Sequence, residues 1–326
     1  MHRIPTLILL LAVVSSCAGS GNPPALLGAA PSSLARVGPT VPVVGGCQIF
    51  PADNPWNTDI SNYPLDPLSS QYINALPGNL HPDFGENPDY GIPFNIVPSD
   101  QPKVPVTFRY NSQSDPGPYP IPPDAQIEGG KNSKGDRHVL VLQQGKCRLY
   151  EMWDAYPVNS GESWQAGSGA IFHLNSNKLR PDGWTSADAA GLPILPALIK
   201  CDEVKAGEID HALRVTFSET QQGHIHPATH YASNSRKKTL PPMGLRLRMK
   251  ASYDTSGLTG QSAVIAAAMK KYGMFVADNG SNWYFQGEGG KNSTCWDDND
   301  LDQLKSIPGS AFEVVETGKI RRKSDL

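Results

Sequence analysis

Short alternations of apolar and polar residues recur along this chain, and they predict β-strands. Apolar and polar residues alternate over residues 213–217 and again over 245–251, and a largely apolar run fills residues 138–142. A period of two places successive side chains on opposite faces of a strand. We therefore expect one face of each alternating strand on a core and its other face in water or against a ligand.

Turn residues between apolar segments predict how some strands connect. A polar turn follows the apolar run and can reverse the chain, so we expect the run to pair with residues 147–153 in a β-hairpin. Asn279-Gly280 separates residues 274–277 from 282–285 and favours a second hairpin, because both turn residues tolerate positive φ. The remaining predicted strands are residues 103–110, at a sheet edge because of Pro105, residues 169–174 and residues 312–315.

Helical spacing is rarer than the strand pattern. Apolar residues share one helical face between Ser262 and Tyr272, and Gly273 is placed to end that helix. Short helices are predicted at residues 69–76 and from Asp297 or Asp298. The chain also contains 31 glycines and 30 prolines, which favour turns and short elements. Together these features predict a mainly β fold: an antiparallel β-sandwich of the jelly-roll type with one or two packed helices.

The first 17 residues differ from the rest of the chain. A basic Arg3 precedes an apolar run over residues 4–14, and small residues then lead to Cys17. This pattern predicts a secretory signal peptide over residues 1–17. Its end resembles the lipobox of bacterial lipoproteins, in which such a cysteine is lipidated after cleavage. The run is far shorter than the roughly 20 residues that a membrane-spanning helix needs.

The composition after Cys17 predicts how the remainder is divided. Residues 18–46 are rich in Gly, Pro, Ala and Ser and predict a flexible linker. We expect a single domain over residues 47–317 and a basic tail over 318–326. With Cys17 lipidated, the other cysteines are even in number, which favours two disulfides over free thiols in an oxidising compartment. The disulfide candidates are Cys47, Cys147, Cys201 and Cys295, with three pairings open.

The charges of the chain are nearly balanced, with 28 Lys and Arg against 31 Asp and Glu. We therefore expect no nucleic-acid partner, and contact with a membrane only through the lipid. The chain has no Gly-x-Ser-x-Gly sequence, no phosphate-binding P-loop and no dinucleotide fingerprint. These absences argue against common α/β-hydrolases, kinases and nicotinamide enzymes. We expect a monomer that meets a polysaccharide or another glycan surface.

Three of the eight histidines, His224, His226 and His230, gather in one short segment. On a strand the first two share a face, so both imidazoles can ligate one divalent metal ion, and the third can return after Pro227. The segment resembles the His-x-His sequence of metal cupins, although His230 stands where a cupin has Glu. The alternatives are a catalytic or sugar-binding histidine without a metal, and a structural cluster.

Other polar residues are candidates for acid–base chemistry. His230 or Tyr231 can act as the base of a polysaccharide lyase, and Arg137 can neutralise the uronate carboxylate of its substrate. His138 follows Arg137 at the start of a predicted strand. Glu151 shares a strand face with apolar residues, so its pKa should rise into the range of a glycosidase acid. Each of these side chains can instead have a structural role.

Aromatic and basic side chains are candidates for binding a sugar chain. Trp164, Trp184 and Trp283 lie in or beside segments rich in Gly, Ser and Asn, where an exposed indole can stack on a sugar ring. Arg246 and Arg248 share one strand face and suit an anionic polysaccharide. The alternatives are that the tryptophans anchor loops to the core and that the arginines form a solvated face.

Several short strings are distinctive as a set. They occupy residues 54–57, 135–138, 183–193, 241–246 and 277–284. Together they resemble a family of secreted bacterial proteins, over a stretch from about residue 47 to about residue 316. The resemblance implies a single domain and carries no activity, cofactor or catalytic residue.

These features favour an extracytoplasmic carbohydrate-active protein, and we expect a polysaccharide lyase or a glycoside hydrolase first. The alternative is a non-catalytic lipoprotein that binds glycan or interacts with the cell envelope. The second alternative is a cupin-like metal-dependent enzyme. A divalent metal ion at the histidine cluster is the one cofactor that the sequence suggests.

Overall fold

Strands outnumber helices in the computed structural model, which describes residues 41–291 and 293–322. The expected mainly β fold with a few helices is confirmed. The predicted signal peptide with Cys17 lies outside the described residues, as do residues 18–40 of the predicted linker and 323–326 of the basic tail. Within the described part of the chain, none of the helices has the length and apolar character of a membrane span.

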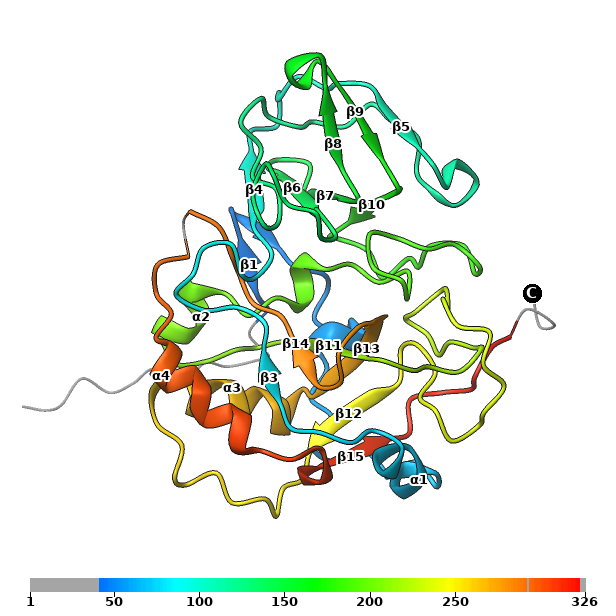
Figure 1. The fold of residues 1–326 in the computed structure, drawn as a ribbon, viewed down its shortest axis with the longest axis vertical. Coiled ribbons are helices and arrows are strands. Elements are labelled where there is room, and N and C mark those ends of the chain that lie inside the picture. Colours follow the sequence, from blue (N-terminus) through cyan, green and yellow to red (C-terminus); the bar gives the residue numbers. More distant parts are fainter. Residues whose placement is uncertain (1–40, 292, 323–326) are drawn as a thin grey trace, which may run out of the picture. The chain divides into compact units, whose positions relative to one another are not determined.

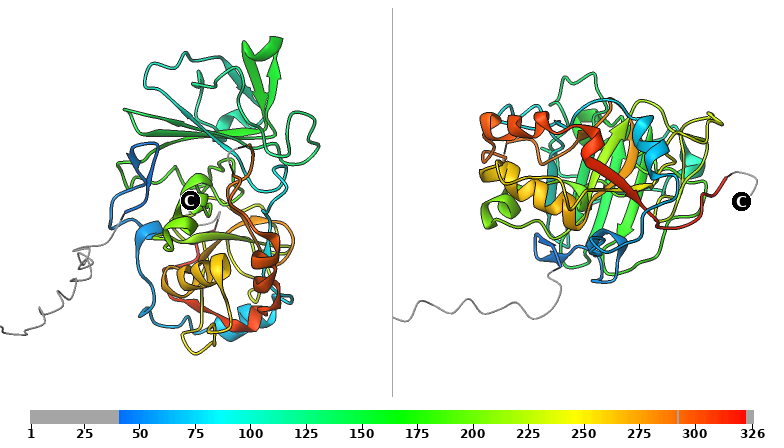
Figure 2. Two further views of the ribbon diagram at one scale, coloured as in Figure 1. Left: turned by 90° about the vertical axis from the view of Figure 1, so that its left-hand side faces the viewer. Right: turned by 90° about the horizontal axis from the view of Figure 1, so that it is seen from below.

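A six-stranded mixed sheet is the largest sheet that the described residues form (Figure 1). Its strands, in spatial order, are β15 (Phe312–Val315), β12 (Arg246–Met249), β13 (Met274–Asn279), β11 (Leu213–Phe217), β14 (Tyr284–Phe285) and β3 (His81–Pro82). Helix α3 (Gly260–Lys271) packs against β12 and lies beside this sheet in both views of Figure 2. The 3-10 turn η4 (Leu195–Ala197) packs against β11.

Strand β11 is buried along its whole length. The alternating sequence predicted one face in water or against a ligand, and this expectation is wrong because neighbouring segments cover both faces. The polar side chains of β11 therefore find partners inside the protein. Arg214 forms an ion pair with Asp188, and the Thr216 hydroxyl donates to the Ser281 carbonyl at 2.8 Å.

A four-stranded sheet contains the hairpin that the polar turn predicted. Its strands, in spatial order, are β10 (Ser168–His173), β7 (Arg148–Trp153), β6 (Val139–Gln143) and β4 (Phe94–Val97). β6 and β7 are antiparallel, with Leu142 opposite Leu149, so this hairpin is confirmed. β10 extends the antiparallel pairing on the other side of β7, whereas β4 runs parallel to β6.

The remaining strands form two smaller sheets. One has the order β5 (Val106–Phe108), β9 (Ser163–Ala166) and β8 (Tyr156–Val158), so β5 is an edge strand, as Pro105 predicted. The other pairs β1 (Val43–Val44) with β2 (Cys47–Gln48). Because β1 falls within the predicted linker, regular structure begins before Cys47.

The hairpin predicted around Asn279-Gly280 does not form. β13 and β14 each pair with β11, which lies between them, parallel to β13 and antiparallel to β14. The turn contacts the end of β11 instead, where the Gly280 N–H donates to the Phe217 carbonyl at 3.2 Å. A period of two defines the faces of a strand, but neither its partner nor its direction.

Parallel pairing also separates this fold from an all-antiparallel jelly roll. The pairs β11–β13, β14–β3, β4–β6 and β5–β9 are all parallel. The finer expectation of an antiparallel sandwich is therefore not confirmed.

The short helices lie where the sequence predicted them. α1 (Ser69–Asn74) falls within residues 69–76. α4 (Asp298–Leu301) begins after Asp297, whose carboxylate accepts the Asn299 N–H at 2.9 Å and so caps the helix. One further helix, α2 (Cys201–Ala206), was not predicted.

Two disulfides confirm the expectation from the even number of cysteines. Cys47 is bonded to Cys147 and Cys201 to Cys295, with Cα atoms 5.4 and 5.7 Å apart. This pairing is one of the three that the sequence left open. Disulfides persist in oxidising compartments, so the bonds support a location outside the cytoplasm.

Candidate active site

Two of the three tryptophans expected to bind sugar belong to the core. Trp164 is 3% exposed and Trp283 is 0% exposed, so neither can stack on a ligand. Trp283 donates its Nε1–H to the Leu76 carbonyl at 2.8 Å and thereby anchors a loop. Trp184 is half-buried, in the loop of residues 180–193.

The two arginines of β12 are occupied by the protein itself. Arg246 is buried, and its guanidinium donates to the carbonyls of Tyr272 at 2.9 Å and Thr58 at 3.2 Å. Arg248 forms an ion pair with Glu313 at 2.8 Å. The expected basic stripe for an anionic polysaccharide is therefore wrong, because these guanidinium groups are already satisfied.

Arg137 and His138 are also internal residues. The Arg137 guanidinium is buried and donates to three backbone carbonyls, of which that of Ser133 lies at 2.9 Å. His138 Nδ1 lies 2.7 Å from a carboxylate oxygen of Glu128. Burial alone would lower the pKa of His138, but the Glu128 carboxylate raises it to about 9. Because backbone carbonyls already occupy its guanidinium, Arg137 is unable to neutralise a substrate carboxylate.

Glu151 has the raised pKa that its strand position predicted, but it does not reach a cavity. It is fully buried and accepts the backbone N–H groups of Ile194 and Leu195 at 2.9 Å. Burial raises its pKa to about 7. Because it lines neither of the cavities described below, its role is to hold this backbone segment.

A cavity of about 470 Å³, called the Asp278 cavity, collects aromatic side chains and carboxyl groups. Its walls include Tyr110, Asp136, Trp153, His230, Tyr231 and Asp278. Trp153 ends β7 and Asp278 lies near the end of β13, so two different sheets contribute to these walls. The described lining residues include no lysine or arginine.

Asp278 belongs to a network of charged side chains that extends from the cavity into the core. Behind it, the buried Asp188 accepts two hydrogen bonds from Arg214, with Nη2 at 2.6 Å and Nε at 3.2 Å. Asp278 accepts the backbone N–H groups of Asn279 at 2.6 Å and Ala189 at 3.3 Å. Burial, and then the Asp188 charge, raise the pKa of Asp278 to about 8, so this carboxyl group is protonated at neutral pH.

His230 and Tyr231 are the sequence candidates that do reach this cavity. His230 Nδ1 lies 2.7 Å from the Ala189 carbonyl, which assigns the proton to Nδ1 and leaves Nε2 as an acceptor. Burial lowers the pKa of His230, so the neutral ring predominates at neutral pH. The Tyr231 ring stacks on it, with the centroids 6.0 Å apart.

His230 does not join the other two histidines at a metal site. Asp182 takes its place: Asp182 Oδ1 lies 2.7 Å from His226 Nε2 and 3.2 Å from His224 Nε2. These three side chains can hold a metal ion. The expected ligand set is thus corrected at one position, because His230 is turned toward the Ala189 carbonyl.

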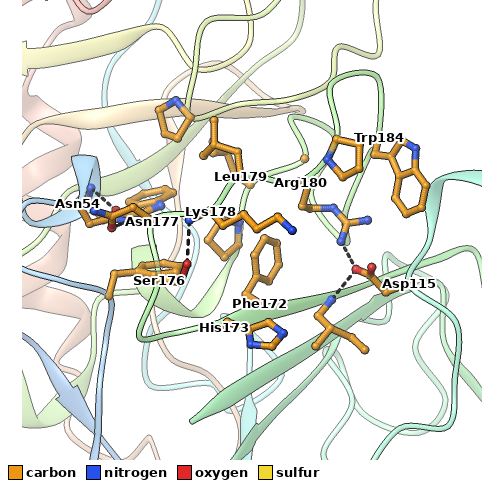
Figure 3. A pocket seen from close by; sticks show the side chains of 18 residues that line it. Asn54, Asp115, Phe172, His173, Ser176, Asn177, Lys178, Leu179, Arg180 and Trp184 are labelled. Carbon is orange, nitrogen blue, oxygen red and sulfur yellow. Dashed lines mark hydrogen bonds and ion pairs between the residues drawn. The ribbon is translucent and has the colours of Figure 1, made fainter. Parts of the chain in front are cut away.

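A second cavity, of about 570 Å³, is also lined by residues of the loop 180–193 (Figure 3). Arg180 forms an ion pair with Asp115 there, and its guanidinium lies 5.7 Å from the Phe172 ring and 5.6 Å from the Trp184 ring. The Lys178 side chain extends across this cavity in Figure 3, so we call the cavity the Lys178 cavity. No residue with acid–base function was predicted in this cavity.

The residues that sequence reasoning missed are Asp188, Arg214 and Asp278. Each lay inside a segment already noticed, since Asp188 and Asp278 fall in two of the distinctive strings and Arg214 in an alternating strand. The available signal for Arg214 was a charged residue between apolar neighbours in a short strand. No family model, no curated protein and no solved structure matches this chain. The functional proposal therefore depends on the geometry of the cavity.

Proposed function

We propose that this protein is an extracytoplasmic glycoside hydrolase in which Asp278 is the catalytic acid. The observation that carries this proposal is a cavity whose wall holds two carboxyl groups, Asp278 and Asp136, beside aromatic rings. Burial raises the pKa of Asp278 to about 8, which supports its role as an acid. Glycoside hydrolysis requires a carboxylic acid that protonates the departing oxygen. Trp153 and Tyr110 also line this cavity, with their rings nearly parallel and the centroids 6.4 Å apart, and such aromatic rings suit contact with the apolar faces of a sugar.

The charges behind Asp278 support this role. Asp188 carries the negative charge of the pair, and Arg214 compensates it through two hydrogen bonds. A second negative charge on Asp278 is therefore unfavourable, which keeps its proton in place until the bond between the sugar and the departing oxygen breaks and that oxygen gains negative charge. Asp188 and Arg214 act through Asp278, and we infer that they are positioning residues.

Asp136 is the other carboxyl group that lines the cavity. It is exposed, and one of its oxygens accepts the Trp153 Nε1–H at 3.0 Å. We assign to Asp136 the second carboxylate role, as the base or nucleophile of the reaction. His230 Nε2 is then an acceptor that can orient the attacking water or a sugar hydroxyl.

The lyase alternative has less support than hydrolysis. A lyase needs a cation that neutralises the substrate carboxylate while the neighbouring proton is removed. Arg137, Arg246 and Arg248 are engaged elsewhere, and no lysine or arginine appears among the described residues that line this cavity. Arg109 lies over the Tyr110 and Trp153 rings, but it forms an ion pair with Asp154. We therefore propose a neutral glycan as the substrate. The disulfides and the predicted anchor at Cys17 support action at the cell envelope.

The first prediction concerns Asp278. We expect Asp278→Asn to reduce the release of reducing ends from neutral polysaccharides about 10²–10⁴-fold, because the amide cannot donate this proton. For the wild type, kcat/KM should fall above about pH 8 as Asp278 loses its proton. The control is Asp302→Asn, which removes an exposed carboxylate that pairs with Lys305.

Three other results would decide against this proposal. Full activity of the Asp278 variant would exclude its acid role. Products with the ultraviolet absorbance of an unsaturated uronate would indicate a lyase. Binding of a polysaccharide without any cleavage would favour the non-catalytic glycan-binding protein.

A further inference from the structure

Asp182, His224 and His226 form a compact group of three ligand atoms that all lie within 4.8 Å of one another. Both histidine Nε2 atoms face the same carboxylate oxygen, at 2.7 Å for His226 and 3.2 Å for His224. None of the three side chains lines the Asp278 cavity. Their chemistry is therefore separate from the proposed hydrolysis.

Backbone pairing and packing hold the two imidazoles in place. The His224 N–H donates to the Arg321 carbonyl at 3.0 Å, and the Arg321 N–H donates to the His224 carbonyl at 2.7 Å. The His224 side chain is fully buried, and its ring stacks on that of His226 with the centroids 5.9 Å apart. Because these rings are already ordered, their side chains lose little conformational entropy when a ligand binds.

The third side chain comes from a distant segment and leaves the group open to solvent. Asp182 lies 42 residues before His224, in the loop of residues 180–193. The side chains of Asp182 and His226 are 25% and 35% exposed. An ion can therefore enter from solvent and keep water as a further ligand, as in open metal sites with three protein ligands.

We propose that Asp182, His224 and His226 bind one divalent transition-metal ion. Two imidazole nitrogens with one carboxylate suit zinc, copper, nickel or iron, whereas magnesium and calcium prefer oxygen ligands. The ion joins the loop that carries Trp184 and Asp188 to the segment that pairs with Arg321. Its role is to fix this loop, which contributes residues to both cavities.

Arg321 provides a test of the charge at this site. Its Nη1 lies 3.9 Å from Asp182 Oδ2, so its positive charge opposes a cation on the same carboxylate. Its pairing with His224 uses the backbone alone, so Arg321→Gln should keep that pairing while it removes the repulsion. We expect this variant to bind the metal ion more tightly than the wild type does.

The experiment is a calorimetric titration of the whole protein, stripped with a chelator, with zinc chloride. We expect one zinc ion per chain. Asp182→Asn and His226→Ala should each weaken binding by roughly tenfold or more, since even residues that only support metal ligands have effects of this size. At the same zinc concentration, zinc should raise the melting temperature of the wild type by more than that of these two variants.

His230→Ala separates this site from the set of three histidines that the sequence predicted. It should keep the wild-type affinity for zinc, because Asp182 is the third ligand. Loss of zinc binding in His230→Ala, with circular dichroism showing a folded protein, would overturn the assignment. Failure of the folded wild type to bind zinc, nickel or copper(II) would overturn the whole proposal. Hydrolytic activity has no part in these measurements, so the two proposals can fail independently.

Discussion

Glu151 is a fully buried carboxyl group whose proton is linked to the stability of the fold. Burial raises its pKa from 4.5 to about 7, although two backbone N–H groups donate to it. The folded state therefore binds this proton more tightly than the unfolded chain does. The resulting stability is complete below the unfolded pKa of 4.5 and is lost as the pH rises through about 7.

The second prediction is that Glu151→Gln removes this dependence on pH. From about pH 5 to about pH 8, the free energy of unfolding of the wild type should fall relative to that of the variant by up to about 3 kcal/mol. Urea unfolding at several pH values measures this difference. Glu162→Gln is the control, because Glu162 is exposed. A difference between wild type and Glu151→Gln that stays constant with pH would contradict the raised pKa.

Single residues of the candidate site differed in how far the sequence could identify them. His230 and Tyr231 were noticed because polar residues crowd in their segment, and both line the Asp278 cavity. Arg137 and Arg246 looked available, but a sequence pattern cannot tell that backbone carbonyls already surround a guanidinium group. Asp278 was missed because its pKa depends first on burial and then on the charge of Asp188, which lies in a distant segment.

Among the elements, α4 is a short helix that supports the start of a longer one. The Asp297 carboxylate accepts the N–H groups of Asn299 at 2.9 Å and Asp300 at 3.3 Å. The Ser262 hydroxyl at the start of α3 in turn donates to the Asp300 carbonyl at 2.5 Å. The cap of α4 therefore also helps to order the first turn of α3.

The third prediction concerns this cap. Asp297→Ala should lower the free energy of unfolding by about 1 kcal/mol, because two N–H groups lose their acceptor. Denaturant unfolding measures the change. Asp297→Ser keeps an acceptor at the same place and should recover most of the loss. Equal losses in both variants would show that the cap is not the cause.

The elements also show which pairings a sequence can reveal. The β6–β7 hairpin was predicted because its turn is local and its strands are neighbours in the sheet. The pairing of β13 with β14 was predicted wrongly because β11, from some sixty residues earlier in the chain, lies between them. Local turn signals carry no information about a strand that enters from elsewhere.

At the scale of the whole molecule, two disulfides close loops of nearly equal size. The bonded cysteines are 100 residues apart in one bond and 94 in the other. In the chain-entropy account, a loop of about 100 residues contributes roughly 4.7 kcal/mol by restricting the unfolded chain. The sequence predicted that two bonds form, but the pairing depends on which segments the fold brings together.

The fourth prediction follows from these loop sizes. The double variant Cys201→Ser with Cys295→Ser should lose about 4.7 kcal/mol of unfolding free energy. The variant Cys47→Ser with Cys147→Ser should lose nearly the same amount, and it is the matched comparison. Denaturant unfolding of both variants measures the losses. A large difference between them would show that local packing, and not loop closure, governs the effect.

The six-stranded sheet joins β3 at residues 81–82 to β15 at residues 312–315. In this sheet β3 pairs with β14, so it has no partner until β14 has been synthesised. The outer neighbour of β12 is β15, which is synthesised last of these strands. A growing polypeptide therefore cannot complete the sheet until nearly all of it has been synthesised, and such long-range pairing is slow. For a chain that is exported as its first residues predict, this topology leaves the six-stranded sheet incomplete while the polypeptide is still being made, so that this part of the chain can still be threaded.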